Sequence, residues 1–251
     1  MVSLQDNKVI RIRCAQSGFV TTIIFFLASA LANAQIVTDI DGNVYKTVTI
    51  GAQVWMAENL KSTRYNDGTA ISLVTEGKVW AIPSTPAYCW YNNDEATNKK
   101  AYGALYNWYA VDSASNGGKN VCPVGWHLPP DSLWTILTDY LVSNGYGYGG
   151  SVINIAKSMA YIAGWSEAPG EGEIGYEQAK NNTSGFAALP SGYRDFDGTF
   201  DAAGSFTGWW AGTEYGPGDA WSRVMIYSGS NISRQENSKE IGYSVRCVRK
   251  D

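Results

Sequence analysis

The chain has 251 residues, 19 basic and 23 acidic side chains and a formal net charge of −4. An acidic balance does not suit a polyanionic partner, so the composition disfavours nucleic-acid binding. The 27 glycines, with many Asn, Asp and Ser, divide the apolar residues into short runs, which favours strands and loops over a mainly helical protein.

The first 34 residues are typical of a secretory signal peptide. Three basic residues precede an uncharged apolar run over 19–32, which ends in the small-x-small triplet Ala-Asn-Ala at 32–34. The run is shorter than the roughly 20 residues of a membrane-spanning helix, so we expect cleavage rather than an N-terminal anchor. The mature chain, residues 35–251, is then a single secreted or cell-surface-associated domain with no transmembrane segment.

Short strands are predicted in the first part of the mature chain. Residues 37–38 and 44–50 flank Asp41-Gly42-Asn43, and a glycine there supplies the positive φ of a tight turn, so the pattern predicts a hairpin. A further strand is expected in the segment 54–60. The segment 88–91, Tyr-Cys-Trp-Tyr, is typical of a buried strand.

Two helices are predicted in the middle of the chain. Residues 101–111 place several large side chains on one helical face, and residues 131–141 do so more clearly, with Leu133, Trp134, Leu137 and Leu141 at helical spacing. Two prolines precede the second helix, and we expect the Asp131 side chain to accept the free amide hydrogens of its first turn. A glycine-rich loop over 144–151 follows, and a last strand is expected over 243–248.

Seven segments occur in an order that resembles the Fibrobacter succinogenes major paralogous domain, a family of secreted and surface-displayed bacterial modules. They are DIDGNVYKTVTIGAQVWMAENL, YCWYNNDEA, AYGALYNWYAV, CPVGWHLPPDSLWTIL, GFAALPSGYRDFDGTF, WWAGTEY and GYSVRCVRKD. The resemblance extends from Asp39 to Asp251. It implies little about biochemistry, because members of this family largely lack assigned activities.

A more distant similarity concerns the fold. The segment after His127, the Trp-Trp-x-x-Thr-Glu stretch and the final strand resemble the formylglycine-generating enzymes, which have a C-type lectin-like fold. The matching positions are Leu128, Pro129, Trp134, Trp210, Thr213, Glu214, Gly242, Arg246 and Val248. The sequence departs at Pro130, where that pattern prefers a hydroxyl or carboxylate helix cap. The similarity implies an α+β, C-type lectin-like domain with small twisted antiparallel sheets, about two helices and long loops.

Three cysteines follow the signal sequence. Cys122 lies just before the 131–141 helix and Cys247 lies in the last strand, so a disulfide between them would tie the end of the chain to the start of the helix. We expect this pair, with Cys89 free and buried. The competing pair is Cys89–Cys247.

The sequence offers weak signals for catalysis or metal binding. His127 is the only histidine, which excludes a histidine-rich zinc site and any two-histidine mechanism. Alternating aspartates at Asp195, Asp197 and Asp201 resemble a calcium loop, but aspartates beside glycine also form plain turns. We therefore predict no cofactor, with calcium as the alternative for this segment.

An exposed aromatic platform for sugar rings is one interpretation of Trp209-Trp210 near Glu214, Tyr215 and Trp221. However, adjacent residues in a strand point to opposite faces of the sheet, so at least one of the two tryptophans is expected in the core. The structural role of such rings is to bury a large area with few residues.

Three function classes remain open. The first is a non-catalytic module that binds carbohydrate or another cell-surface polymer, or that serves in cell-surface adhesion. The second is a structural or display protein without a small-molecule ligand. The third, a formylglycine-generating type of oxidoreductase, is disfavoured because it needs a pair of thiolates in the C-terminal region, where only Cys247 lies. We expect no enzyme, and a ligand site in the glycine-rich stretch that forms the exposed loops of lectin-like folds, at Arg194, Asp195, Asp197, Trp209, Trp210 and Glu214.

Overall fold

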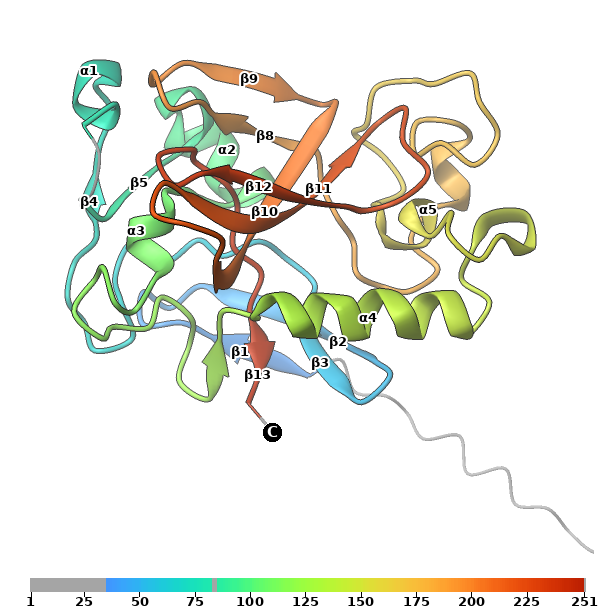
Figure 1. Ribbon diagram of the computed structural model, residues 1–251, viewed down its shortest axis with the longest axis horizontal. Coiled ribbons are helices and arrows are strands. Elements are labelled where there is room, and N and C mark those ends of the chain that lie inside the picture. The colour runs from blue at the N-terminus through green and yellow to red at the C-terminus, as the bar shows by residue number, and fades with distance from the viewer. Residues whose placement is uncertain (1–34, 83–84, 251) are drawn as a thin grey trace, which may run out of the picture. The chain divides into compact units, whose positions relative to one another are not determined.

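Three small sheets and a set of short helices make up an α+β fold (Figure 1). The computed structural model describes residues 35–82 and 85–250, so the predicted signal peptide lies outside the described residues. The α-helices are α1 (Gly77–Trp80), α2 (Glu95–Tyr102), α3 (Trp108–Val111), α4 (Asp131–Ser143) and α5 (Ala156–Met159). Single 3-10 turns lie at Tyr91–Asn93, Tyr148–Gly150 and Gln178–Lys180. Within these ranges no helix is long and apolar enough to cross a membrane.

The sheets join parts of the chain that are far apart in sequence. The first is antiparallel and has the order β1 (Ile36–Thr38), β2 (Val44–Ile50), β3 (Gln53–Met56), β13 (Val248–Arg249), β7 (Trp126–His127). The second has the order β12 (Ser233–Ser238), β11 (Asp219–Ile226), β10 (Phe206–Glu214), β8 (Ser191–Arg194), β9 (Phe200–Ala203), with β8 parallel to β10. The third is β4 (Ser72–Leu73), β5 (Ala87–Cys89), β6 (Leu105–Tyr106).

The predicted N-terminal hairpin is confirmed. Strands β1 and β2 pair in antiparallel register, and Gly42 in the turn has φ +82°. The buried Asp39 side chain closes the turn: its Oδ1 accepts from the backbone N–H groups of Asp41 and Asn43, and its Oδ2 accepts from the Tyr45 hydroxyl at 2.6 Å. The carboxylate thereby satisfies backbone donors that the tight turn leaves without strand partners.

Helix α4 is present and extends two residues beyond its predicted end. Its apolar face buries Trp134, Leu137 and Leu141 completely. The expected cap is wrong, because Pro130 is the N-cap residue and the Asp131 carboxylate instead pairs with Arg223 and Arg234. The helix is anchored by its first N–H, which Asp131 donates to the Thr213 hydroxyl at 3.0 Å.

The single helix expected over 101–111 is wrong. Helix α2 ends before Gly103, which has φ +77° and lies so close to the backbone of residue 60 that a Cβ would be 2.7 Å from its carbonyl oxygen. The chain then forms β6, whose Leu105 and Tyr106 pair with β5, before the single turn of α3. Tertiary pairing here outweighs a weak helical pattern. The prediction of about two helices is too low, since the described residues contain five α-helices, of which only α2 and α4 exceed one turn.

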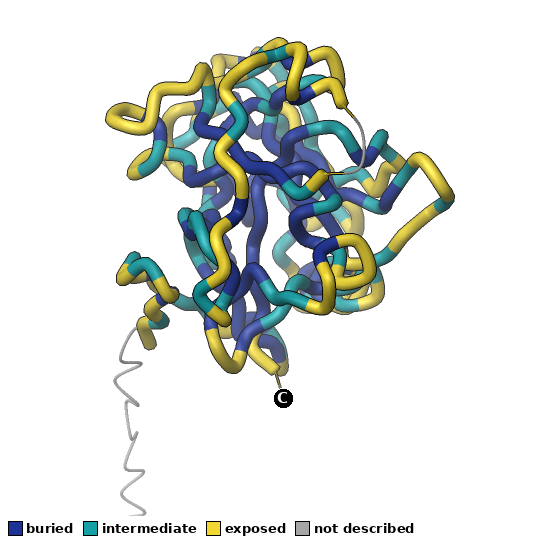
Figure 2. Tube along the Cα trace, turned by 90° about the vertical axis from the view of Figure 1, so that its left-hand side faces the viewer, coloured by how far each residue is buried: buried dark blue, intermediate teal, exposed yellow. Residues whose placement is uncertain are grey.

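The core consists of aromatic clusters on the two faces of β10. Trp209 packs with Trp134 and Phe186, at centroid distances of 5.8 and 5.7 Å, whereas Trp210 packs on Tyr243 at 5.0 Å. Because neighbouring side chains of a strand alternate, the pair fills two separate apolar clusters. Figure 2 shows the buried segments running through the middle of the trace.

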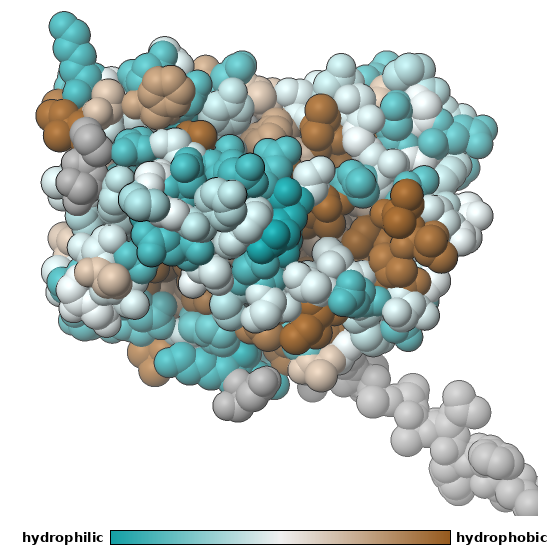
Figure 3. Space-filling view, viewed as in Figure 1, coloured by the Kyte–Doolittle hydropathy of each residue, from teal (hydrophilic) through white to brown (hydrophobic). Residues whose placement is uncertain are grey.

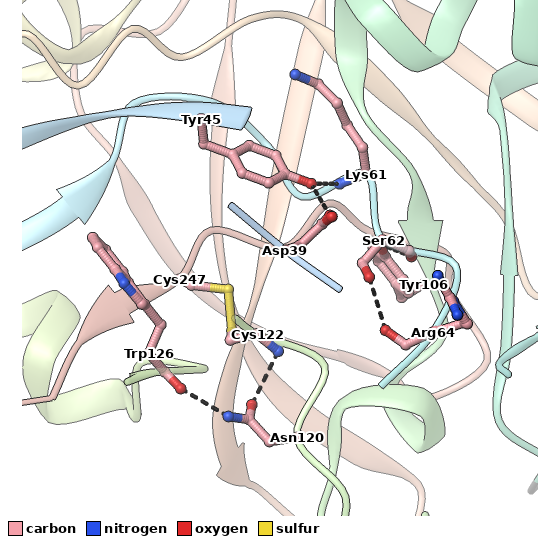
Figure 4. The surroundings of a disulfide bond; sticks show 10 residues. All are labelled: Asp39, Tyr45, Lys61, Ser62, Arg64, Tyr106, Asn120, Cys122, Trp126 and Cys247. Carbon is pink, nitrogen blue, oxygen red and sulfur yellow. Dashed lines mark hydrogen bonds between the residues drawn. A yellow bond between two sulfur atoms is a disulfide. The ribbon is translucent and has the colours of Figure 1, made fainter. Parts of the chain in front are cut away.

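The expected disulfide between Cys122 and Cys247 is present, and Cys89 is free and buried, so the pair Cys89–Cys247 is excluded (Figure 4). Asn120 orients the bond by accepting from the Cys122 N–H at 3.0 Å and donating to the Trp126 carbonyl at 2.7 Å. The last strand is shorter than predicted, since only Val248–Arg249 are paired as a strand. Residues 243–247 make isolated bridges and single hydrogen bonds instead.

Candidate functional site

The two tryptophans of the predicted platform cannot form it, because both are fully buried. The indole N–H of Trp209 donates to Asn59 Oδ1 at 3.0 Å, and that of Trp210 donates to the Tyr106 carbonyl at 2.8 Å. Each ring therefore has its polar atom satisfied inside the protein. The expectation that they stack on a sugar ring is wrong for both.

Arg194 is also a structural residue. Its side chain is fully buried and lies between the rings of Trp80 and Phe200, 4.5 and 4.8 Å from their centroids. Its guanidinium donates to the carbonyls of Val74 and Thr75 at 2.5 and 2.9 Å. These contacts hold the β4 region against β8 and leave the side chain inaccessible to a ligand.

The predicted acidic residues separate into different roles. Asp197 Oδ1 accepts from the N–H and the hydroxyl of Thr199, which is an ordinary turn. Glu214 is exposed and pairs with the buried Lys239 ammonium. Asp201 lies in β9, and its side chain accepts from the N–H of the next residue, Ala202. Among the described residues, no group of three or more acidic, histidine or cysteine side chains is placed to hold a metal ion.

The remaining aromatic residues of the predicted platform form an edge-on arrangement. Tyr215 and Trp221 meet at 4.8 Å with an interplanar angle of 75°, and the Arg234 guanidinium lies 3.2 Å from the Trp221 ring centroid. One face of Trp221 is thus already covered by a cation, and the two rings meet edge to face, so they do not form one flat platform for a sugar ring.

An aromatic pocket of about 360 Å³ lies on the β12-β11-β10 sheet, on the face opposite Trp221. Three aromatic rings in mutual contact form its wall: Tyr193 from β8, Phe206 from β10 and Tyr243 from the final segment, with centroid distances from 5.3 to 6.3 Å. A fourth aromatic residue, Tyr227, also lines the pocket. Ile226 and Ile241 add apolar surface, and Asp195, Asn237 and Ser205 add polar groups. Of the predicted ligand residues, this pocket contains only Asp195.

The polypeptide backbone makes room for this wall. A Cβ at Gly208 would lie 2.7 Å from the Tyr243 ring, so only glycine lets that ring lie flat on β10. Asn237 is held by a hydrogen bond from its Nδ2 to Ser222 Oγ at 2.8 Å. Both features fix wall residues before any ligand arrives, which reduces the entropic cost of binding.

The phenols of Tyr193 and Tyr243 remain neutral at physiological pH. Burial raises the pKa of Tyr193 above its ordinary value, and the carboxylates of Asp201 and Asp195 raise it further. Burial likewise raises the pKa of Tyr243, with added contributions from Tyr193 and Asp195. A neutral phenol can both donate and accept a hydrogen bond, which suits a ligand rich in hydroxyl groups.

A larger hollow of about 610 Å³ is a weaker candidate. It lies between Asn43 and α2 and is lined by Lys61, Lys99 and Lys100. Two of these cations are already paired, Lys61 with Glu58 at 2.6 Å and Lys99 with Glu95 at 2.8 Å. No aromatic ring lines it, so it lacks the apolar wall that is typical of small-molecule sites.

Sequence reasoning missed Tyr193, Phe206, Asn237 and Tyr243 as site residues. One local signal was available, because Tyr193 and Asp195 stand two apart at the end of a strand and therefore share a face. The contribution of Tyr243 carried no such signal. Bridges from Tyr243 to Tyr106 and from the neighbouring Gly242 to Arg194 place it there, and both join segments far apart in the chain.

Comparison with known proteins gives a family and no named relative. A search of curated proteins and a search of solved structures each returned no match. The Fibrobacter succinogenes major domain matches residues 48–249, which is most of the chain and includes every residue of the aromatic pocket. The chain therefore belongs to the Fibrobacter succinogenes major domain family.

Proposed function

We propose that the protein is a secreted or cell-surface-associated, non-catalytic binding module with a C-type lectin-like architecture, and that it binds carbohydrate in the aromatic pocket. The observation that carries the proposal is the convergence of Tyr193, Phe206 and Tyr243 with the polar groups of Asp195 and Asn237 in one hollow. Aromatic faces supply contact area at little entropic cost, and carboxylate and amide groups pair with sugar hydroxyls.

The size and shape of the pocket bear on the ligand. A volume of about 360 Å³ is near the lower end for small-molecule sites and suits one or two sugar rings of a longer polymer. A hollow that is open on one side leaves much of the ligand in water. We therefore expect affinities in the millimolar to micromolar range, about 4–8 kcal/mol.

Titration of the protein with cell-wall and plant glycans tests this proposal. We expect Tyr193→Ala to weaken binding at least tenfold by removing one ring of the wall. Asp195→Asn keeps the shape of the side chain and removes its charge. Weaker binding by this folded variant would therefore report the loss of a polar contact and not a loss of the fold. Tyr215→Ala is the matched control, since this tyrosine is 55% exposed and lies outside the pocket.

A structural or display role is the second candidate, and the burial of Trp209 and Trp210 favours it. Both rings stabilise the core, so the aromatic richness of this region does not by itself require a ligand. If no glycan binds, or if Tyr193→Ala and Tyr215→Ala weaken binding equally, the pocket is not the site and the display role takes precedence.

A further inference from the structure

Strand β12 is one of the two outer strands of the second sheet, and its sequence is Ser-Arg-Gln-Glu-Asn-Ser. It pairs with β11 on one side only, and Arg234, Gln235 and Glu236 are exposed. In the view of Figure 3, hydrophilic side chains cover the middle of the face, where Figure 1 draws β11 and β12, and hydrophobic ones gather further to the right. An outer strand presents backbone donors and acceptors to which another strand can pair.

The register identifies which residues point their backbone groups outward. Lys239 donates its N–H to the Gly218 carbonyl at 3.0 Å, next to the paired residues Asp219 and Ser238. Hydrogen-bonded pairs alternate along an antiparallel ladder, so Asn237, Gln235 and Ser233 face β11. Arg234 and Glu236 consequently direct their N–H and C=O groups away from the sheet.

We propose that two copies of the chain associate through β12, in antiparallel register centred on Gln235. Only outward-facing residues form hydrogen-bonded pairs across such an edge, and the registers that pair most of β12 centre on residue 235 or 236. Centring on 236 places Glu236 opposite Glu236 of the second copy, and centring on 234 places Arg234 opposite Arg234. Directly opposed like charges are destabilising. Centring on Gln235 places Arg234 opposite Glu236 twice.

The contacts of Arg234 prepare it for this role. Its Nε and Nη2 bind the Asp131 carboxylate at 2.9–3.1 Å, and its guanidinium rests on the Trp221 ring. A guanidinium has five N–H donors, so it can hold Asp131 and still reach a carboxylate on the facing strand. The side chain is therefore ordered before association, and little rotamer entropy is lost on pairing.

The dimer would present two binding surfaces in one direction. Antiparallel pairing of identical strands sets the two-fold axis perpendicular to the sheet, so equivalent faces of both copies point the same way. The aromatic pocket lies on the face opposite Trp221 and would remain open in each copy. A repetitive polymer could then engage both pockets, which raises the overall avidity.

Sedimentation velocity over about 10 µM to about 1 mM tests the association without any ligand. We expect the wild type to dimerise within this range, and Glu236→Arg and Arg234→Glu each to weaken self-association at least tenfold. A mixture of the two variants should restore the dimer, because every facing pair is then oppositely charged. Glu171→Arg is the matched control, since it makes the same change in charge at an exposed residue outside β12.

Hydrogen exchange supplies a second readout. On dimerisation, exchange should slow at the outward amides of Arg234 and Glu236 and stay unchanged at Gln235, whose N–H is already bonded to β11. Circular dichroism confirms that each variant is folded. A wild type that stays monomeric up to about 1 mM overturns the proposal. A dimer that withstands both charge reversals, or two variants that fail to associate when mixed, also overturns it.

Discussion

Removing the Cys122–Cys247 disulfide should cost much of the stability of this protein. The bond closes a loop of 125 residues, and in the chain-entropy account a loop of that length stabilises the folded state by about 5 kcal/mol. Domains of ordinary stability unfold with 5–15 kcal/mol, so the loss amounts to a third or more of the total. For a chain of this size we expect the melting temperature to fall by about 10–20 °C.

The measurement is urea unfolding of the double variant Cys122→Ala/Cys247→Ala against the wild type. Cys89→Ala is the control, because it removes another buried sulfur without opening a loop, so twice its loss estimates the packing contribution. Burial raises the pKa of the Cys89 thiol to about 12, with Arg194 acting in the opposite direction. Little thiolate is then present at neutral pH in the folded protein, and unfolding at about pH 5 keeps the exposed thiol of the unfolded chain protonated as well, so exchange with the disulfide will not disturb the comparison.

The m-value of the same unfolding curves reports on the unfolded chain. If the cross-link acts by restricting the unfolded chain, the double variant must show a larger m-value as well as a lower midpoint, because its unfolded state exposes more surface. The chain-entropy account is refuted if the m-value is unchanged and the free energy of unfolding, after the packing contribution is subtracted, falls by less than about 2 kcal/mol.

Three further predictions concern single side chains. Gly208→Ala should destabilise the fold by about 1–3 kcal/mol, because the new Cβ meets the Tyr243 ring; a near-neutral denaturation midpoint would contradict this. Trp210→Ala should lower the free energy of unfolding by about 3–5 kcal/mol, and a variant of full stability would show that the ring is not needed for the core. Burial alone would raise the pKa of the Asp131 carboxyl, but hydrogen bonds from Arg234 and Arg223 outweigh it and lower the pKa. Its stabilising contribution is therefore full above about pH 4 and is lost as the pH falls through the lowered pKa. The difference in denaturation midpoint between the wild type and Asp131→Asn should thus disappear in acid, and a difference that does not change with pH would contradict this prediction.

Local features of the fold could be predicted, and features that depend on distant partners could not. The hairpin around Gly42 and helix α4 follow from short patterns of turn residues and apolar spacing. Arg194 was predicted as a ligand residue because two of its three acceptors, the carbonyls of Val74 and Thr75, lie about 120 residues earlier in the chain. A charged side chain is expected at the surface unless its buried partners are known.

The candidate site shows the same division. Asp195 was predicted because it stands in an acidic, glycine-rich turn, and it does line the aromatic pocket. The burial of Trp209 and Trp210 could be predicted for one ring by strand alternation, but not for both, since this requires packed layers on each face of β10. The family, in contrast, was identified correctly from the order of its sequence motifs.

The central position of β13 has a consequence for biosynthesis. Met56 and Leu60 donate their backbone N–H groups to the carbonyls of Cys247 and Val245, and Val248 pairs with Trp55. At translation rates of 5–20 residues per second, β13 is synthesised about 10–40 s after β3, and the edge of β3 that pairs with it has no partner strand during this time. The first sheet therefore cannot be completed before residue 249 has emerged, and a product truncated before β13 would carry an unpaired, aggregation-prone edge.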